Sequence, residues 1–329
     1  MSIEAILKNT LRQIAVTKNY NNSDEKSYLI ITSINNELYK YYQAVKNGND
    51  VHIRPSEILD QLHTVLKLKH TPAAIMNAIM QSLQAKNTPS NKHYVLCLPH
   101  AGGSAQFYNR WIDETRDKYI LVPVELPGHG SKTKSGYPVN LTHMLQLLCE
   151  AITPYLSYEY SIFGHSFGAF LAYEITLLLQ SEGKPTPENL FLSACASPNQ
   201  ISLIGQYMNN LSDIDLWNLL FDLDGTDDSL RMIKGDFQKF YLNLLRSDLQ
   251  LMANYKADMS RKVNAAVTVH TYSEDTELIR LSMSDWRHYC NGLFRLREFN
   301  GNHFSLLHSN EWLNDINKNI MREICDGSA

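Results

Sequence analysis

The sequence predicts an α/β protein with a mostly parallel sheet, preceded by a small all-helical domain. After residue 90, short runs rich in β-branched and aromatic residues alternate with longer helical patterns, as is typical of parallel strands joined by helices. Before residue 90, apolar residues recur at helical spacing only. The polar segment QAKNTPSNKH, residues 84–93, separates the two patterns, so we expect domains over 1–90 and 91–329.

Each element follows from its local pattern. In the first domain, helical spacing covers residues 3–14, 38–45, 58–66 and 73–83. In the second domain, the runs that predict strands are YVLCL (94–98), YILVPVEL (119–126), YSIF (160–163), LFLSAC (190–195), AAVTVHTY (265–272) and LFRLREF (293–299).

The alternation stops between the fourth and fifth predicted strands. Residues 211–258 have the pattern of several amphipathic helices rich in Leu, Phe, Tyr and Met. We expect an insertion over about 199–262 that forms a lid above an apolar pocket. A helical layer that only packs on the sheet is the alternative.

Composition excludes several classes of protein. With 44% hydrophobic and 19% charged residues in 329, the chain can bury a large core. The net charge of −4 comes from interspersed acidic and basic residues, so we expect neither nucleic acid nor an anionic membrane as partner. The five cysteines are scattered without Cys-x-x-Cys spacing, which favours a reducing compartment without disulfides or zinc. Without a signal peptide or a long apolar run, the expected location is the cytoplasm.

The stretch FGHSFGAF contains a Gly-x-Ser-x-Gly motif centred on Ser166. The motif alone is weak, but here a predicted strand precedes it and a predicted helix follows it. In the α/β-hydrolase arrangement a nucleophilic serine occupies this strained turn, and the acid and the histidine follow it in that order. We therefore predict an α/β-hydrolase fold with Ser166 as nucleophile.

A serine nucleophile needs a general base, which in this chain order lies late in the sequence. His303 follows the last predicted strand in the loop NGN, whose glycine permits a sharp turn. His308 falls at the expected entry to the final helix, where a structural role is the better interpretation. We predict His303 as the base.

The acid that orients the base must follow a strand and precede His303. Asp275 and Glu274 both come directly after the strand at 265–272. We choose Asp275 and keep Glu274 as the alternative. The end of the strand at 190–195 supplies no carboxylate, since Ala-Ser-Pro follows it.

The tetrahedral intermediate needs two backbone N–H donors. One comes from the residue after the nucleophile, Phe167. The loop LPHAGGS after the first predicted strand supplies the other, and there Ala101 is the expected donor. A phosphate-binding loop is the weaker interpretation of Gly102 and Gly103, because the chain lacks Gly-x-x-x-x-Gly-Lys-Ser/Thr.

Several stretches together resemble the type II thioesterases that accompany polyketide and non-ribosomal peptide synthases. They are LCLPHAGGSAQFYNRW, VPVELPGHGSK, FGHSFGAFLAYEI, LSDIDL, LLRSDLQLMANYK and FNGNHFSLL, in this order between about residues 93 and 325. The medium-chain thioesterases of fatty-acid synthesis are relatives. The resemblance implies a serine hydrolase that removes acyl groups from the phosphopantetheine arms of acyl or peptidyl carrier proteins, without a cofactor of its own. It also implies a triad of Ser166, Asp275 and His303 with oxyanion donors at Ala101 and Phe167.

The chain departs from the family pattern in two places. The stretch PGHGSK has His129 where the family more often has arginine, which affects a structural or carrier-facing contact. The stretch TYSED lacks the glycine that commonly precedes the acid. Chain-terminating thioesterases usually carry the acid after the strand at 190–195, so its absence there favours the type II pattern.

The segment SINNELYKYYQAVKNGNDVHIRPSEIL in the first domain weakly resembles an acyl carrier protein. A carrier serine is normally preceded by aspartate, whereas Ser33 follows Thr32. A degenerate carrier-like bundle and a generic docking or dimerisation segment both stay open. The leading function is an editing thioesterase. The alternatives are a chain-releasing carrier–thioesterase didomain, a general carboxylesterase or lipase, and a non-catalytic protein that docks a synthase.

Overall fold

The computed structural model describes residues 93–115, 117–223 and 235–326. The helical domain over 1–90, its boundary and Ser33 lie outside these residues, so they stay predictions. Within the described ranges, every helix is too short or too polar to cross a membrane.

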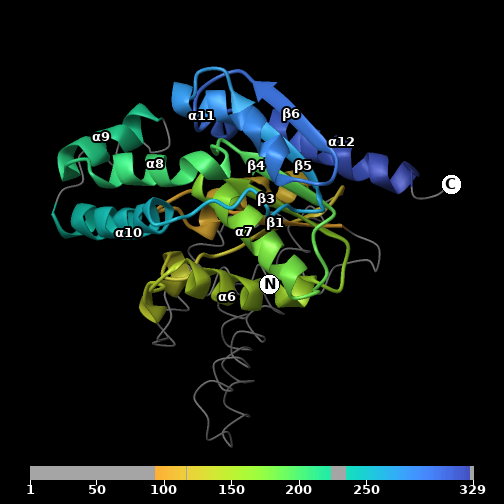
Figure 1. The fold of residues 1–329 in the computed structure, drawn as a ribbon, viewed down its shortest axis with the longest axis horizontal. Helices are drawn as coiled ribbons and strands as arrows, with labels where there is room; N and C mark the ends of the chain where they lie inside the picture. The colour runs from red at the N-terminus through yellow and green to blue at the C-terminus, as the bar shows by residue number, and fades with distance from the viewer. Residues whose placement is uncertain (1–92, 116, 224–234, 327–329) are drawn as a thin grey trace, which may run out of the picture. The chain divides into compact units, whose positions relative to one another are not determined.

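The core of the fold is a six-stranded sheet in the order β2-β1-β3-β4-β5-β6, and every neighbouring pair is parallel (Figure 1). All six predicted strands are confirmed. They are β1 (Tyr94–Leu98), β2 (Ile120–Pro123), β3 (Tyr160–His165), β4 (Asn189–Ser193), β5 (Ala266–Tyr272) and β6 (Phe294–Phe299).

Two strands end earlier than their apolar runs. The strand predicted over 119–126 stops at Pro123, a residue without an N–H for the sheet ladder. The strand predicted over 190–195 stops at Ser193, because Ala194 takes a positive φ of 49° and turns the chain. Its N–H still bonds the carbonyl of His270 on β5 at 2.9 Å, so the turn is firmly attached to the sheet.

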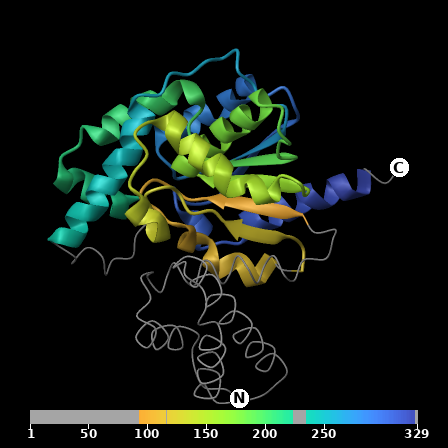
Figure 2. The same cartoon turned by 90° about the horizontal axis from the view of Figure 1, so that it is seen from below.

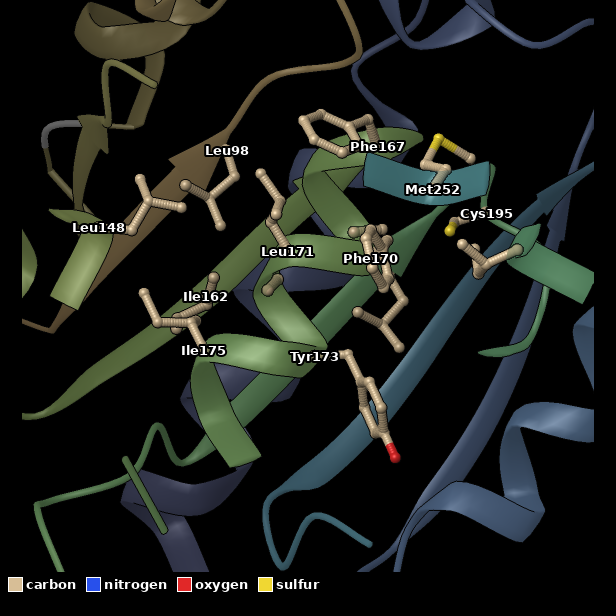
Figure 3. Packing of buried hydrophobic residues seen from close by; sticks show 14 of the residues in the cluster. Leu98, Leu148, Ile162, Phe167, Phe170, Leu171, Tyr173, Ile175, Cys195 and Met252 are labelled. Carbon is tan, nitrogen blue, oxygen red and sulfur yellow. The ribbon is translucent and has the colours of Figure 1, made fainter. Parts of the chain in front are cut away.

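Helices cover both faces of the sheet (Figure 2). On one face, α7 packs along β1, β3 and β4, and α6 packs against α7. Figure 3 shows side chains of α7 in one apolar cluster with Leu98 of β1, Leu148 of α6 and Met252 of α10. The helices of this face are α6 (Leu141–Ile152), α7 (Phe167–Ser181) and the one-turn η3 (Thr153–Tyr155).

The opposite face is held by aromatic side chains. Trp312 lies 4.5 Å from Phe163 of β3 and meets Trp111 edge-to-face at 5.0 Å, both measured between ring centroids. Because successive side chains of β3 point to opposite faces of the sheet, Ile162 faces α7 while Phe163 faces this aromatic layer. The helices that belong to this face are η1 (Ala105–Trp111), α5 (Ile112–Thr115) and α12 (Glu311–Asp326).

A helical insertion follows β4, as the sequence predicts, and its helices lie together at one side of the sheet (Figure 1). It contains α8 (Pro198–Asn209), α9 (Asp213–Asp222) and α10 (Asp236–Ala253). A Cβ at Gly205 of α8 would lie 2.4 Å from the nitrogen of Ala253, so α8 and α10 pack closely. Between β5 and the C-terminus lie the short helices α11 (Glu277–Ser282), η5 (Met283–Tyr289) and η6 (Ser305–Leu307).

The topology fixes where a site can form. After β1 the chain crosses one face through η1 and α5 to reach β2, and it returns over the other face through α6 to β3. The loops after β1 and β3 therefore diverge at the carboxyl edge of the sheet. In open α/β sheets ligands bind at such a switch point.

Candidate active site

Ser166 occupies a sharp turn between β3 and α7. Its φ of 54° and ψ of −119° lie in a region that non-glycine residues rarely adopt and that costs about 1–3 kcal/mol. The flanking glycines are required by close contacts: a Cβ at Gly168 would lie 2.1 Å from the Leu98 carbonyl oxygen, and one at Gly164 would lie 2.3 Å from the Gly168 oxygen. Ser166 is only partly buried, whereas its neighbours His165 and Phe167 are buried.

Hydrogen bonds to neighbouring strands hold this turn in place. The Ser166 N–H donates to the Ser193 carbonyl at 2.7 Å. The His165 Nδ1 lies 3.0 Å from the Ser193 hydroxyl, which lies 3.2 Å from the Tyr272 hydroxyl. The strained backbone at Ser166 is thus supported by β4 and β5.

His303 and Asp275 form a buried pair. The His303 Nδ1 lies 2.9 Å and 3.1 Å from the two carboxylate oxygens of Asp275. The Oδ1, which is the farther of the two oxygens from His303, also accepts the Thr276 N–H at 2.7 Å, and this bond fixes the plane of the carboxylate. With its Nδ1 committed to Asp275, the imidazole keeps its Nε2 for a second partner.

The two alternatives from the sequence do not join this pair. Glu274 is exposed, and its N–H bonds the Gly301 carbonyl at 2.7 Å. His308 is also exposed and follows η6, three residues before α12 begins. The structure therefore brings Asp275, and neither Glu274 nor His308, into contact with His303.

Two further histidines lie beside His303. The rings of His165 and His303 are 5.2 Å apart between centroids, and His100 packs edge-on against Phe304 at 4.8 Å. Burial, with repulsion from His303, lowers the pKa of His100 to about 3 and also lowers the pKa of His165 well below its usual value. Both rings are therefore neutral near pH 7.

The loop after β1 leaves the N–H of Ala101 unused. The Gly103 N–H bonds the His100 carbonyl at 2.9 Å, and the Gly102 N–H bonds the Asp248 carboxylate at 2.7 Å. Among the described residues, the Ala101 N–H has no acceptor. The Phe167 N–H lies in the first turn of α7, where helical N–H groups lack intrahelical partners.

Sequence reasoning missed Asp248 of α10, which is fully buried. The feature of the sequence that could have identified Asp248 is its position on the apolar face of the helix, three residues after Leu245 and four before Met252. The Asp248 Oδ2 lies 2.9 Å from the Nε2 of His129, which is also fully buried. His129 therefore makes a structural contact and cannot face a carrier.

The order of the strands, the sharp turn at Ser166 and the pair of His303 and Asp275 define an α/β-hydrolase. The thioesterase domain family matches residues 93–321. The chain is similar to linear gramicidin dehydrogenase LgrE of Brevibacillus parabrevis, with 26% identity over 70% of this chain and 87% of that protein. It is also similar to the solved structure of RedJ, a thioesterase of the prodiginine pathway in Streptomyces coelicolor, with 27% identity, a TM-score of 0.63 and coverage of 70% of this chain and 94% of RedJ. The type II thioesterase BorB from the borrelidin cluster superposes with a TM-score of 0.60 at 26% identity, over 71% of this chain and 94% of BorB.

The chain belongs to the thioesterase family, and within it to the type II thioesterases of polyketide and non-ribosomal peptide pathways. It is an enzyme of the serine hydrolase type.

Proposed function

We propose that this enzyme hydrolyses acyl thioesters on carrier phosphopantetheine with Ser166 as nucleophile, His303 as base and Asp275 as the orienting acid. The contact of 2.9 Å between the His303 Nδ1 and Asp275 carries the proposal, because it leaves the His303 Nε2 free to accept the proton of Ser166 on the turn between β3 and α7. The Ala101 and Phe167 N–H groups complete it as oxyanion donors.

The reaction takes two steps. His303 accepts the proton of the Ser166 hydroxyl as its oxygen bonds the thioester carbon, and the negative charge moves to the carbonyl oxygen between the Ala101 and Phe167 N–H groups. Collapse of this intermediate breaks the C–S bond, and the departing carrier thiolate takes the proton from His303, which leaves the imidazole neutral again. His303 then deprotonates a water molecule as it attacks the acyl-serine, and it returns this proton to the Ser166 oxygen as the carboxylic acid leaves.

The names of the similar proteins support carriers of peptide or polyketide synthases as the source of the substrate. RedJ belongs to a prodiginine pathway and BorB to a borrelidin cluster. Removal of stalled acyl groups from such carriers is the role that a stand-alone type II enzyme would have. Acyl or peptidyl carrier domains are then its protein partners.

Intact-mass spectrometry of acyl-loaded carriers tests the proposal. The enzyme should return acetyl-, longer acyl- and aminoacyl-carriers to the free thiol form, and Ser166→Ala should abolish this while its circular dichroism spectrum stays unchanged. A fluorophosphonate should label the wild type at Ser166 only. Rapid cleavage of p-nitrophenyl esters with all carriers left loaded would instead identify a general esterase. If Ser166→Ala still hydrolysed the acyl-loaded carriers fully, Ser166 could not be the nucleophile.

A further inference from the structure

Asp248 collects hydrogen bonds from three separate segments. Its carboxylate accepts the Gly102 N–H from the loop after β1 at 2.7 Å, the His129 Nε2–H from the loop after β2 at 2.9 Å, and the Tyr137 hydroxyl. Asp248 itself belongs to α10 of the helical insertion. One fully buried carboxylate thus joins the insertion to the loop that carries Ala101.

The geometry of His129 makes it the counter-ion of Asp248. Its Nδ1 lies 3.0 Å from the Pro127 carbonyl oxygen and its Nε2 lies 2.9 Å from the Asp248 carboxylate. Both partners only accept, so both ring nitrogens must carry hydrogen, and the ring is an imidazolium.

The electrostatic surroundings agree with this charge. Burial alone would lower the pKa of His129, but the charge and hydrogen bond of Asp248, helped by the Pro127 carbonyl and Glu125, raise it above its usual value. His100, whose pKa is lowered to about 3, is the neighbouring titratable group on the β1 side and stays neutral. The hydroxyl of Tyr137 completes the contacts of the ion pair.

We propose that Asp248 is a positioning residue for thioester hydrolysis: by holding the Gly102 N–H it fixes the loop that presents the Ala101 N–H to the oxyanion. This inference rests on the proposed function of Ala101. It makes α10, and with it the helical insertion, part of the support of the oxyanion site.

The loop needs this support because few bonds of its own hold it. Glycine adopts the φ of 70° at Gly102 without strain, and the turn is closed by the bond from the Gly103 N–H to the His100 carbonyl. That carbonyl belongs to the same peptide as the Ala101 N–H, so the turn sets the direction of the donor. Asp248 holds the next peptide, and the Glu125 Oε1 holds the Ala105 N–H at 2.9 Å on the far side. Buried carboxylates therefore fix the loop at both ends.

Asp248→Asn is the sharpest perturbation, since it keeps the shape and removes the charge. Without the carboxylate, His129 keeps only the hydrogen that faces Pro127, and its Nε2 then needs a donor. The Asn amide can give its NH₂ to His129 or its oxygen to Gly102, but these two contacts share one position. A matched control is Glu174→Gln: Glu174 is also buried, and it bonds Tyr255 and Arg261, away from the β1 loop.

The assay measures kcat and KM for one acyl thioester, and the inhibition constant of an alkyl trifluoromethyl ketone, whose serine adduct places an oxyanion at the same donors. We expect Asp248→Asn to lower kcat by about 10- to 100-fold, since loss of a whole donor costs about 10²–10³. KM should change by less than about threefold, and the ketone should bind more weakly by the factor that kcat/KM loses. Glu174→Gln should keep kcat and ketone binding within about twofold of the wild type.

Several results would overturn the role of Asp248: unchanged kcat in Asp248→Asn, a lower kcat with unchanged ketone binding, or an equal loss in Glu174→Gln. If Asp248→Asn does not fold, Tyr137→Phe removes one partner of the carboxylate and should lower kcat and ketone binding together by about threefold; no change in either would refute the proposal. A wild type that leaves the thioester intact would refute the proposed function instead, so the two failures differ.

Discussion

Replacing Asp275 by asparagine should block catalysis by selecting the wrong tautomer of His303. The Thr276 N–H donates to the Asp275 Oδ1 at 2.7 Å, so the asparagine oxygen will keep that position and its NH₂ will face the His303 Nδ1. The Nδ1 must then accept a hydrogen bond, which moves the hydrogen to the Nε2. An Nε2 that carries hydrogen cannot take the proton of Ser166.

The expected loss in kcat is roughly 10⁴-fold, as for the equivalent change in a serine protease triad. This corresponds to about 5.5 kcal/mol in the activation free energy, at about 1.4 kcal/mol for each factor of ten. Steady-state hydrolysis of an acyl thioester measures it, with the exposed Glu274→Gln as the matched control that should stay within about twofold. A loss below tenfold in Asp275→Asn, or a larger loss in Glu274→Gln, would refute the assignment of the acid.

Four other changes have distinct expected outcomes. Gly168→Ala places a Cβ 2.1 Å from the Leu98 carbonyl oxygen, so the melting temperature should fall by several degrees, at about 2–4 °C per kcal/mol. The raised pKa of His129 contributes stability that is complete below about pH 6.5 and is lost as the pH rises through the folded pKa; urea unfolding at pH 6 and pH 9 should show a steeper decline for the wild type than for His129→Gln. Phe240→Asp, at a side chain that is 48% exposed, should reduce turnover of long acyl thioesters more than that of acetyl thioester, and equal losses would identify a packing layer. Ser33→Ala and the wild type should both stay unmodified, by intact mass, after incubation with a promiscuous phosphopantetheinyl transferase and coenzyme A; a gain of one phosphopantetheine in the wild type alone would favour the carrier–thioesterase didomain.

The central strands could be predicted because β1, β3 and β4 are buried along their whole length and appear as apolar runs, whereas the edge strand β6 is partly exposed and alternates apolar with charged residues. The strand ends could not, since they depend on single backbone features such as Pro123 and the positive φ of 49° at Ala194. The turn at Ser166 was also predictable from its motif: Gly164 is required by a contact within the strand–turn–helix unit, although Gly168 is required by the neighbouring strand β1. Local patterns thus determine most of the sheet and the turn at Ser166.

The helical insertion shows where local patterns fail. The sequence predicts that the apolar side chains of this insertion lie above a pocket, yet Leu220 is 7% exposed and part of the core cluster. A charge at Leu220 would therefore destabilise the fold before it could report on the acyl pocket. Helical periodicity gives the apolar face of a helix, but it does not say which neighbour covers that face.

The contact between His129 and Asp248 is another feature that local patterns could not predict. Each residue has an ordinary local explanation, a loop histidine after β2 and an acidic residue on an amphipathic helix, and 119 positions separate them in sequence. Their shared role is visible only in the folded structure, where α10 places the Asp248 carboxylate 2.7 Å from the Gly102 N–H. An arginine at position 129 would keep its charge at every pH near neutrality, whereas a histidine can lose it. We therefore expect the support of the β1 loop to depend on pH with His129, as it would not with an arginine.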